Sequence, residues 1–476
     1  MDKARELLQR YWGYTTYRPL QQEIISSVLA GRDTLAILAT GSGKSLCYQL
    51  PALCLGGVTL VVSPLLALMK DQVDALNRRG IPAAAWTSTL DSRGRAQLGE
   101  GLKNGTIQLL FVSPERCVQP AFLACLKDCP LRLIAVDEAH CISAWGHNFR
   151  PEYRQLAGLR KAFSGVPVIA LTATATPDVR KDIARQLGLV HPQEYVGSFD
   201  RKNLTYQVQK KTDPDLFLRT FLRRHRNETG IVYCRSRQET EDLARSLKKR
   251  GFTVAAYHAG LSQQVRESVQ DAFLKGELQA VLATIAFGMG IDKPDVRFVV
   301  HTCLPRSPEA YYQETGRAGR DGEPGECVLL YSPADAARLR ALASRDGYTS
   351  GTLRVALAKI DAMRDFCESP GCRRRHLLRY FGEAYPIENC GSCDACAGIA
   401  GSDAEDALFL RLKTVRKNLA EKRGVLPYLI FADKSLREMA KVRPGDRVGF
   451  AAISGVGPFK LEKYGPAFLE AIRAGG

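Results

Sequence analysis

A glycine-rich turn near the start of the sequence constrains the fold of this chain more than any other feature. The turn follows the apolar run Leu35–Leu38 and ends in Gly-Lys-Ser, with Leu38 standing where the general pattern has its first glycine. Backbone N–H groups of such a turn cradle phosphates, its lysine reaches the β/γ oxygens and its serine holds Mg²⁺. The turn therefore predicts a nucleoside-triphosphate site where a buried strand meets a helix. Its predicted residues are Thr40, Gly41, Ser42, Gly43, Lys44 and Ser45.

An acidic pair supports the same chemistry. Asp137 and Glu138 directly follow the apolar run Leu131–Val136, which places them at the carboxyl end of a predicted strand. There Asp137 can join the Mg²⁺ shell, and Glu138 can take a proton from an attacking water. The alternative is a glycine-rich turn beside an unrelated surface acidic pair. Because both features follow predicted strands, the pairing favours an enzyme that hydrolyses nucleoside triphosphates.

Length and charge indicate several domains and a polyanionic partner. A chain of 476 residues is too long for one core and suggests three or four domains. The formal net charge of +17 and the isoelectric point near 9.3 favour a partner rich in phosphates, although a basic but indifferent surface is the alternative. No apolar run approaches the length of a membrane span, and the acidic start is unlike a secretory signal.

Apolar strand-like runs alternate with amphipathic stretches twice along the chain, which predicts two αβ domains in tandem. The first set of predicted strands is Leu35–Leu38, Val58–Val62, Ile107–Val112, Leu131–Val136 and Val168–Leu171. The second set is Gly230–Tyr233, Thr253–Tyr257, Leu278–Ala283, Val296–His301 and Cys327–Tyr331. The hinge between the two domains is expected near Ser198–Asn203.

The chain turns helical after Tyr331, and the segment Gly398–Ser402 is typical of a short linker. The predicted domain bounds are 1–201, 202–345, 346–400 and 404–476. We expect an α/β protein with two αβ lobes in tandem, the first of which binds the nucleotide, followed by a small helical subdomain and a final basic, all-helical unit.

Two arginines in the second αβ domain can complete the nucleotide site. Gln313 lies close to Arg317 and Arg320, and the arginines are three residues apart, on a turn leading into or along a helix. Arginines supplied by a second lobe stabilise charge on a transferred phosphoryl group. The alternative is a basic helix cap.

These motifs resemble those of superfamily 2 helicases and, more narrowly, of the RecQ family. The glycine-rich turn, Asp137-Glu138-Ala139-His140 and Gln313–Arg320 resemble motifs I, II and VI, which implies two RecA-like lobes with ATP between them. Other resembling elements are Ser63-Pro64-Leu65, Ser113–Arg116, Thr172-Ala173-Thr174 and Ala286–Asp292. Tyr14, Arg18 and Gln21 resemble the RecQ motif in which the glutamine reads adenine and the other two flank the base, which implies ATP as substrate.

An aromatic-rich segment after the acidic pair predicts contact with single-stranded DNA. Trp145, His147 and Phe149 can stack on unpaired bases, and Arg150 can hold a phosphate. The segment resembles the RecQ loop that couples DNA contact to ATP hydrolysis, although the family usually carries an acid at Asn148. The alternative is that the aromatic rings are simply core. The predicted DNA contacts are Ser63, Arg116, Trp145, His147, Phe149 and Arg150.

Four cysteines predict a structural metal site. Cys372, Cys390, Cys393 and Cys396 form a C-x17-C-x2-C-x2-C pattern, which suits tetrahedral Zn²⁺. An iron–sulfur cluster and unliganded thiols are the alternatives. The pattern resembles the RecQ zinc-binding subdomain. The other ten cysteines, among them Cys367, are interpreted as small, buried hydrophobic residues. Together with the predicted ATP site, they indicate a protein of the reducing cytosol.

The last unit resembles an HRDC domain. Glycines and lysines in the segment 454–465 can approach a phosphate, although a basic bundle used for protein contacts is the alternative. RecQ proteins usually carry a winged-helix domain between the zinc module and HRDC, and this chain has almost no sequence there. How it grips and splits a duplex is therefore left open.

The resemblance implies an ATP-dependent 3′-to-5′ DNA helicase of repair and recombination that uses ATP, Mg²⁺ and Zn²⁺. The alternatives are an RNA helicase and an ATP-switched DNA-binding or strand-annealing protein. We expect single-stranded and tailed duplex DNA as partners, with single-strand-binding protein as a candidate protein partner and no membrane. We further expect a monomer in the cytoplasm, associated with the nucleoid if the protein is bacterial.

Overall fold

The computed structural model describes residues 2–473 apart from 88–89, 147–148, 286, 288–292, 346, 398–400, 424 and 426. It also leaves out the side chains of residues 67, 401–407, 410, 428–429 and 433–434. The chain divides into two compact units, residues 1–390 and 391–476.

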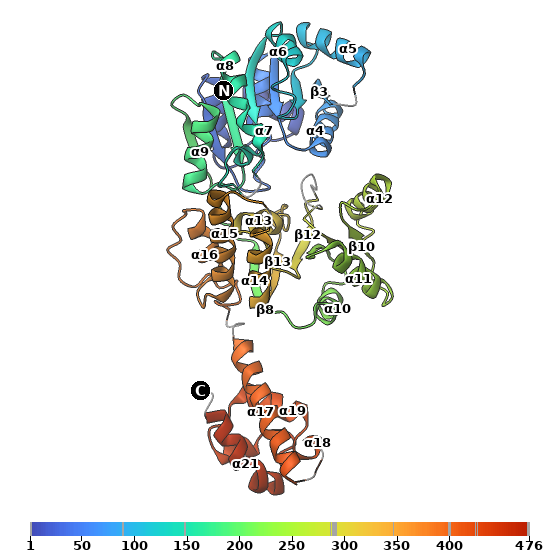
Figure 1. Cartoon of the computed structure of the whole chain (residues 1–476), viewed down its shortest axis with the longest axis vertical. Helices are drawn as coiled ribbons and strands as arrows, with labels where there is room; N and C mark the ends of the chain where they lie inside the picture. Colours follow the sequence, from blue (N-terminus) through green and yellow to red (C-terminus); the bar gives the residue numbers. More distant parts are fainter. Residues whose placement is uncertain are drawn as a thin grey trace. The chain divides into compact units, whose positions relative to one another are not determined.

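Lobe 1, at the N-terminal end of the first unit, is built on a seven-stranded parallel sheet with the order β3-β4-β2-β5-β6-β1-β7. Helices flank this sheet in Figure 1. Its strands are β1 (Thr34–Ile37), β2 (Val58–Val62), β3 (Ala83–Trp86), β4 (Leu109–Val112), β5 (Leu131–Val136), β6 (Val168–Thr172) and β7 (Gln193–Val196). The strands β1, β2 and β4 are buried along their whole length, because their apolar side chains are covered on both faces.

The helices of lobe 1 bury apolar faces against this sheet. Phe111, Leu133 and Ile169 from three strands share one core with side chains of the helices α2, α3 and α4. The helical elements are α1 (Asp2–Trp12), α2 (Gln21–Leu29), α3 (Leu46–Leu55), α4 (Leu66–Arg78), α5 (Ser92–Lys103), α6 (Pro120–Lys127), the 3₁₀ turn η1 (Ala139–Ile142), α7 (Pro151–Arg154), α8 (Leu156–Ala162) and α9 (Pro177–Leu187).

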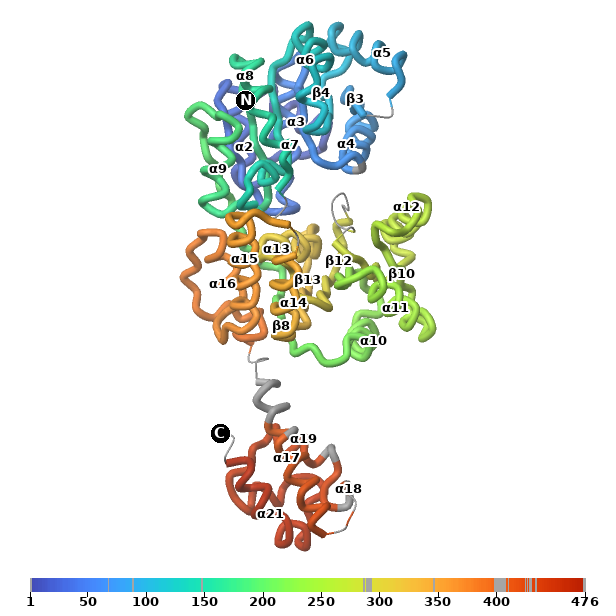
Figure 2. The backbone as a smooth tube through the Cα atoms, in the orientation of Figure 1, coloured from blue at the N-terminus to red at the C-terminus, as the bar shows by residue number. Residues whose placement is uncertain are grey.

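Lobe 2 is built on a six-stranded parallel sheet with the order β10-β11-β9-β12-β13-β8. The chain leaves the first sheet after β7 and enters the second at β8, which is labelled in Figure 2. The strands are β8 (Leu204–Lys210), β9 (Thr229–Tyr233), β10 (Val254–Tyr257), β11 (Ala280–Ala283), β12 (Val296–His301) and β13 (Gly325–Tyr331). The expected pair of αβ lobes, each built on a parallel sheet, is confirmed.

Helices complete lobe 2, and strands end at β13 in the described part of the chain. Phe221 and Leu247 pack with Phe298 in a core between the helices α10 and α11 and the sheet. The helices are α10 (Pro214–Arg224), α11 (Arg237–Lys248), α12 (Gln263–Leu274), α13 (Pro308–Thr315), α14 (Pro333–Ala343), α15 (Ser350–Glu368) and α16 (Arg373–Tyr380).

The second unit is all-helical where it is described, as expected, and has its own core. Phe431, Phe450 and Phe468 are fully buried and meet edge-on or at a tilt. The helices are α17 (Gly401–Arg423), α18 (Pro427–Ile430), α19 (Asp433–Val442), α20 (Arg447–Ala451) and α21 (Pro458–Arg473). Throughout the described chain, no helix combines the length and the apolar character that a bilayer crossing requires.

Candidate ATP site, metal centre and nucleic-acid interface

The glycine-rich turn lies between the end of β1 and the start of α3, as predicted. Gly41 and Gly43 have φ values of +83° and +82°, a conformation that favours glycine. A Cβ atom on Gly43 would lie 2.6 Å from Nε2 of Gln21. The turn thus needs glycine both for its backbone angles and for the close approach of a side chain from α2.

Lys44 is folded back onto the turn. Its Nζ donates a hydrogen bond to the carbonyl oxygen of Leu38, 3.3 Å away. Burial lowers the pKa of the Lys44 ammonium, and Arg320 lowers it further, whereas Glu138 and Asp137 act in the opposite direction. The lysine therefore lies among the predicted catalytic groups of both lobes.

The motif upstream of the turn wraps onto it. Nε2 of Gln21 donates to the carbonyl oxygens of Ser42 and Gly43, at 3.2 and 3.1 Å, and Arg18 donates to that of Gly41. Gln21 is buried, whereas Tyr14 is 53% exposed. The Gln21 amide thus contacts the phosphate turn in this structure, whereas Tyr14 is exposed.

The acidic pair lies at the carboxyl end of β5. Burial raises the pKa of the Asp137 carboxyl to about 7, and neighbouring Glu138 adds to the rise. Burial raises the pKa of the Tyr48 hydroxyl, the charge of Asp137 raises it further, and a hydrogen bond with Ser45 lowers it. Ser45 and Asp137 therefore both lie near this hydroxyl. A buried carboxylate beside a serine hydroxyl suits a hard divalent cation, so these residues fit Mg²⁺.

Glu138 is held in a strained conformation that aims it at a histidine. Its φ of 48° and ψ of 44° lie in the left-handed region, which a residue with a side chain seldom adopts. Its Oε2 is 3.2 Å from Nδ1 of His140, and that nitrogen is 2.8 Å from Oγ1 of Thr172 at the end of β6. Burial alone would lower the pKa of His140, but Cys141 and Glu138 raise it.

Arginines of lobe 2 reach this site to different extents. A Cβ atom on Gly41 would lie 3.4 Å from Cγ of Arg320, so the Arg320 side chain passes directly over the phosphate turn. Arg317 is 5% exposed and forms a hydrogen bond with Tyr233. Gln313 is half-buried near the end of α13. Of the three predicted residues of lobe 2, Arg320 is therefore the one that lies against the phosphate turn.

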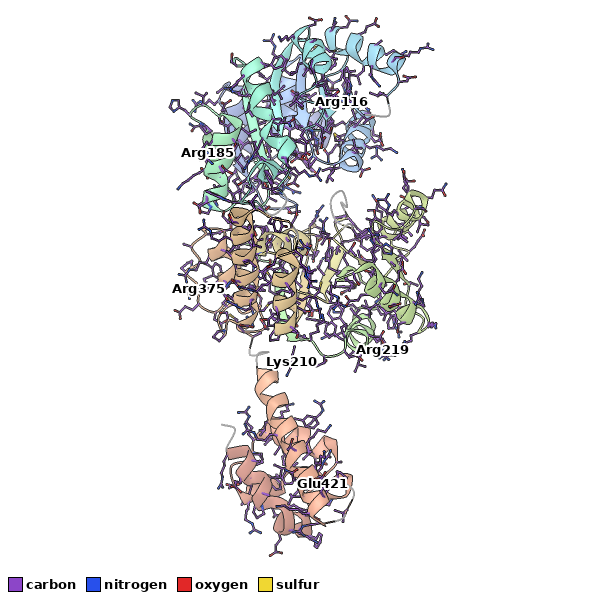
Figure 3. All side chains as sticks on the ribbon, viewed as in Figure 1. Arg116, Arg185, Lys210, Arg219, Arg375 and Glu421 are labelled. Carbon is purple, nitrogen blue, oxygen red and sulfur yellow. The ribbon has the colours of Figure 1, made fainter. Side chains whose placement is uncertain are left out.

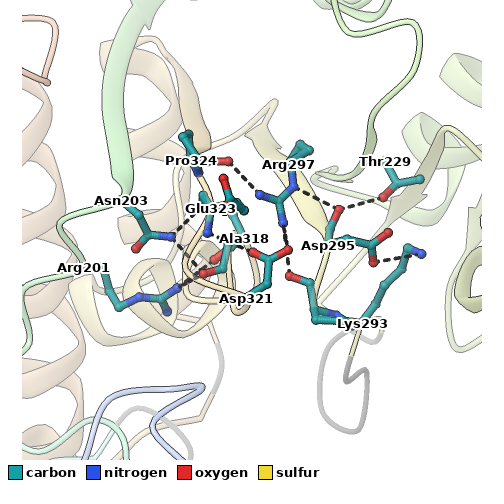
Figure 4. Close-up of polar contacts among 12 residues, drawn as sticks. Arg201, Asn203, Thr229, Lys293, Asp295, Arg297, Ala318, Asp321, Glu323 and Pro324 are labelled. Carbon is teal, nitrogen blue, oxygen red and sulfur yellow. Dashed lines mark hydrogen bonds and ion pairs between the residues drawn. The ribbon is translucent and has the colours of Figure 1, made fainter.

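A further arginine, Arg201, joins the two lobes and was missed by the sequence prediction. Its guanidinium donates to the carbonyl oxygens of Thr40 (3.1 Å) and Gly316 (3.2 Å), and also to those of Ala318 (2.9 Å) and Gly319 (2.8 Å). Figure 4 shows Arg201 and Asn203 directed at the loop that carries Ala318. Across that loop, Arg297 donates to the carbonyl oxygens of Asp295 and Pro324 and pairs with Asp321. The backbone that presents Arg317 and Arg320 is thus fixed from several directions.

The aromatic segment does not lie in the core. Trp145 is 46% exposed and Phe149 is 36% exposed, with the guanidinium of Arg154 4.8 Å from the Phe149 ring centroid. Arg150 donates to the carbonyl oxygen of Pro64 at 3.0 Å, so it ties this segment to another predicted DNA-contact element. His147 and Asn148 lie outside the described residues.

The other predicted DNA contacts differ in exposure. Ser63 is only 2% exposed, so its hydroxyl is enclosed in this structure. Arg116, which is labelled in Figure 3, is half-buried and hydrogen-bonded to Gln119. Most of the predicted RecQ-like element Ala286–Asp292 lies outside the described residues, namely 286 and 288–292.

The four predicted cysteines come together. The Sγ atoms of Cys372, Cys390, Cys393 and Cys396 all lie within 4.8 Å of one another. Tetrahedral zinc with bonds of about 2.3 Å would hold its sulfurs about 3.8 Å apart, so the cluster fits this metal. The group does not include Cys367, which is buried near the end of α15.

The two arginines that follow Cys372 brace the surrounding structure. Arg373 donates to the last carbonyl oxygens of α15, including that of Phe366 at 2.7 Å. Arg374, only 4% exposed, pairs with Asp200 and donates to the carbonyl oxygens of Arg201 (2.7 Å) and Leu204 (2.6 Å). The start of the metal module is therefore bonded to the segment that connects the two sheets.

Comparison with known families matches four models along the chain. The DEAD/DEAH box helicase model matches residues 18–183 and the helicase conserved C-terminal domain matches residues 214–322. The RecQ zinc-binding model matches residues 333–397 and the HRDC domain matches residues 405–472.

Curated relatives match over nearly the whole length. The ATP-dependent DNA helicase RecQ of Pasteurella multocida is 37% identical, with 99% of this chain and 93% of that protein covered. That of Bacillus subtilis is 36% identical, with coverage of 100% and 99%. The chain belongs to the RecQ family. Within this family, the RecQ-like DNA helicase BLM of Xenopus laevis is 42% identical over 83% of this chain but only 30% of its own length.

The RecQ relatives also contain a segment that this chain lacks. The alignment with the P. multocida helicase spans 592 positions, whereas this chain has 476 residues. Only residues 398–404 separate the matched zinc-binding and HRDC ranges. The very short connection expected between these modules is therefore confirmed.

Solved structures share the helicase fold at low sequence identity. The helicase Lhr of Mycobacterium smegmatis, bound to ssDNA and AMP-PNP, has a TM-score of 0.55 at 23% identity, with 77% of this chain and 57% of that chain covered. Dbp5 of Saccharomyces cerevisiae, bound to RNA and ADP BeF3, has a TM-score of 0.56 at 16% identity, with coverage of 74% and 97%. These likenesses concern the fold alone.

Proposed function

We propose that this RecQ-family helicase translocates 3′ to 5′ along single-stranded DNA by hydrolysing ATP between its two lobes. The observation that carries the proposal is the placement of Arg320 of lobe 2 directly over Gly41 of the phosphate turn in lobe 1. A site shared by two lobes senses whether ATP is intact, because the arginine is drawn in by the phosphate charge. Opening and closing of the lobes would then move the DNA contacts relative to each other.

Each site residue has a distinct role in this proposal. Lys44 would leave its bond to Leu38 and hold the β/γ-phosphates, and Ser45 and Asp137 would hold Mg²⁺, which offsets phosphate charge when bound. Glu138 would accept the proton of the attacking water, with His140 and Thr172 fixing its orientation. Arg317 and Arg320 would stabilise the charge that develops on the transferred phosphoryl group. Tyr14, Arg18 and Gln21 would recognise adenine, and Gln313 would contact the phosphates.

The exposed aromatic segment supplies the DNA contact. Trp145 and Phe149 would stack on bases, and their exposure supports this role over a place in the core. Arg116 and Arg150 would face phosphates, and His147 would stack on a base. Ser63 would contact DNA only after a local rearrangement, since the whole residue is enclosed in this structure.

Two tests separate this proposal from its alternatives. A chain that moves 3′ to 5′ should displace streptavidin from a 5′-biotinylated oligonucleotide in the presence of ATP and leave a 3′-biotinylated one occupied. ATP hydrolysis should be stimulated by single-stranded DNA far more than by RNA of the same sequence. Equal displacement from both ends, or stronger stimulation by RNA, would contradict the proposal.

We further propose the domain bounds 1–201, 202–345, 346–400 and 404–476. Deletion of 404–476 should weaken DNA binding modestly and leave DNA-stimulated hydrolysis intact, since all proposed catalytic residues precede this unit. Most of the residual affinity should be electrostatic and should fall steeply with added salt. Loss of DNA stimulation in the 1–400 fragment would overturn the assignment.

The family and the cysteine-rich composition support a proposal for the cellular location of the protein. We propose a monomer in the cytoplasm, on the nucleoid in a bacterium, that acts on single-stranded and tailed duplex DNA beside single-strand-binding protein. Its roles would lie in DNA repair and recombination.

A further inference from the structure

A single lysine connects the aromatic segment of lobe 1 to the arginine-bearing helix of lobe 2. Lys359 lies midway along α15, and only 13% of its side chain is exposed. Its Nζ donates to the carbonyl oxygen of Trp145 at 2.6 Å and pairs with Oε1 of Glu309 at 2.9 Å. Lysine is seldom buried this deeply without a partner, and here one ammonium serves two partners from two lobes.

The two partners lie on segments that lead to opposite sides of the ATP site. Trp145 follows the 3₁₀ turn η1, which begins immediately after Glu138. Glu309 lies in the first turn of α13, and the chain beyond this helix carries Arg317 and Arg320. Because η1 and α13 are short, regular elements, a shift at Lys359 would be passed on to both Glu138 and the arginines.

The two contacts of the ammonium differ in strength. Glu309 is 2% exposed, so its carboxylate depends on a cation and hydrogen bonds for stability. Burial raises the pKa of the Tyr380 hydroxyl, and its hydrogen bond with Glu309 raises it further, which places a second polar partner on this carboxylate. The bond to Trp145 instead reaches the backbone of an exposed segment. This bond is the one that DNA binding can alter.

We propose that Lys359 is a positioning residue that transmits the placement of the Trp145 segment to α13, and so links DNA contact to ATP hydrolysis. The inference rests on the proposed stacking of Trp145 on DNA. When DNA fixes the segment, the Lys359–Glu309 pair holds α13 in the position at which Arg320 covers the phosphate turn. Without this pair, both lobes keep their catalytic residues, but DNA binding no longer aligns the residues of one lobe with those of the other.

The test compares Lys359→Met with Lys359→Arg and with Arg354→Met, an exposed cation on the same helix. The methionine keeps an apolar stem of similar length and removes the charge. We expect Lys359→Met to lower the ratio of DNA-stimulated to basal ATPase by about fivefold or more, in the usual range of coupling between sites. Basal hydrolysis, the KM for ATP without DNA and the zinc content should be unchanged. Arg354→Met should keep the wild-type ratio, and Lys359→Arg should retain most of it.

A second variant covers the case in which Lys359→Met leaves Glu309 unpaired and the protein unfolds. In Lys359→Met/Glu309→Gln neither charge of the buried pair is left, so the chain should fold and show the same loss of stimulation. A stimulation ratio within twofold of wild type in either folded variant would overturn the inference. So would an equal fall in the basal and stimulated rates, which would indicate a purely structural role. A wild-type protein that DNA does not stimulate would instead contradict the proposed function.

Discussion

The guanidinium of Arg201 is hydrogen-bonded to the carbonyl oxygen of Thr40, 3.1 Å away, across 161 positions of sequence. Thr40 belongs to the phosphate turn of lobe 1, and Arg201 lies in the segment between β7 and β8. The same guanidinium holds three carbonyl oxygens beside Arg317 and Arg320. One side chain therefore fixes the two parts of the ATP site relative to each other.

Replacement of Arg201 by lysine should impair hydrolysis although the charge is kept. A compact ammonium cannot reach four carbonyl oxygens in the planar geometry of a guanidinium. Loss of one charge-assisted hydrogen bond costs roughly 1.5–3 kcal/mol, and about 1.4 kcal/mol corresponds to tenfold in rate. ATPase assays should show kcat at least about tenfold lower with and without DNA. Lys202→Met, at the exposed neighbouring position, should behave like wild type, and wild-type turnover in Arg201→Lys would contradict this role.

Substitutions at the ATP site should separate binding from turnover. Lys44→Ala should abolish hydrolysis, because the β/γ-phosphates lose a positioned cation, and DNA binding should persist. Glu138→Gln should retain ATP binding and stop turnover, because the amide cannot accept the proton. Binding of a fluorescent ATP analogue and phosphate release together measure both effects. Turnover close to wild type in either variant would exclude the assigned role.

Trp145→Ala should reduce the DNA-stimulated ATPase far more than the basal rate. The ring is 46% exposed, so its removal should leave the fold intact, and stacking contributes about 1–3 kcal/mol per base. Affinity for single-stranded DNA, measured by fluorescence anisotropy, should fall about 5- to 150-fold. Trp145→Phe keeps a ring and should retain most of the stimulation. If the alanine variant responds to DNA as wild type does, the stacking role is wrong.

Elemental analysis should find one zinc per chain. Cys393→Ser should yield a poorly soluble protein without zinc, because metal binding at such a site is folding energy. Cys367→Ser provides the control, since this buried thiol lies outside the four-cysteine group and should leave the zinc content unchanged. Bound iron with a brown colour, or a stable metal-free protein, would overturn the zinc assignment.

Strand prediction from the sequence succeeded where burial was complete and failed at weaker signals. The ten predicted strands are all present, because runs of apolar side chains covered on both faces are distinctive. The prediction missed β3, which contains three alanines, a residue depleted in strands. It also missed β7 and β8, which are edge strands with exposed or alternating side chains. These three strands form because of their position in the sheet, which a local sequence pattern does not record.

The site shows the same division between local and long-range information. Lys44, Glu138 and the four cysteines were predicted because phosphate and zinc chemistry require those residue types at fixed spacings. Arg201 and Lys359 had no such signature. Their partners lie 161 and 214 positions away, so the contacts exist only once the lobes and the zinc module are assembled.

Strand displacement on a 3′-tailed duplex tests most directly that this chain is a helicase despite the short connection between its zinc module and HRDC domain. With ATP and Mg²⁺, the full chain should separate this duplex, leave 5′-tailed and blunt duplexes paired, and lose the activity in Glu138→Gln. DNA-stimulated ATP hydrolysis without any displacement of the 3′-tailed strand would contradict the account and would indicate an ATP-switched DNA-binding protein.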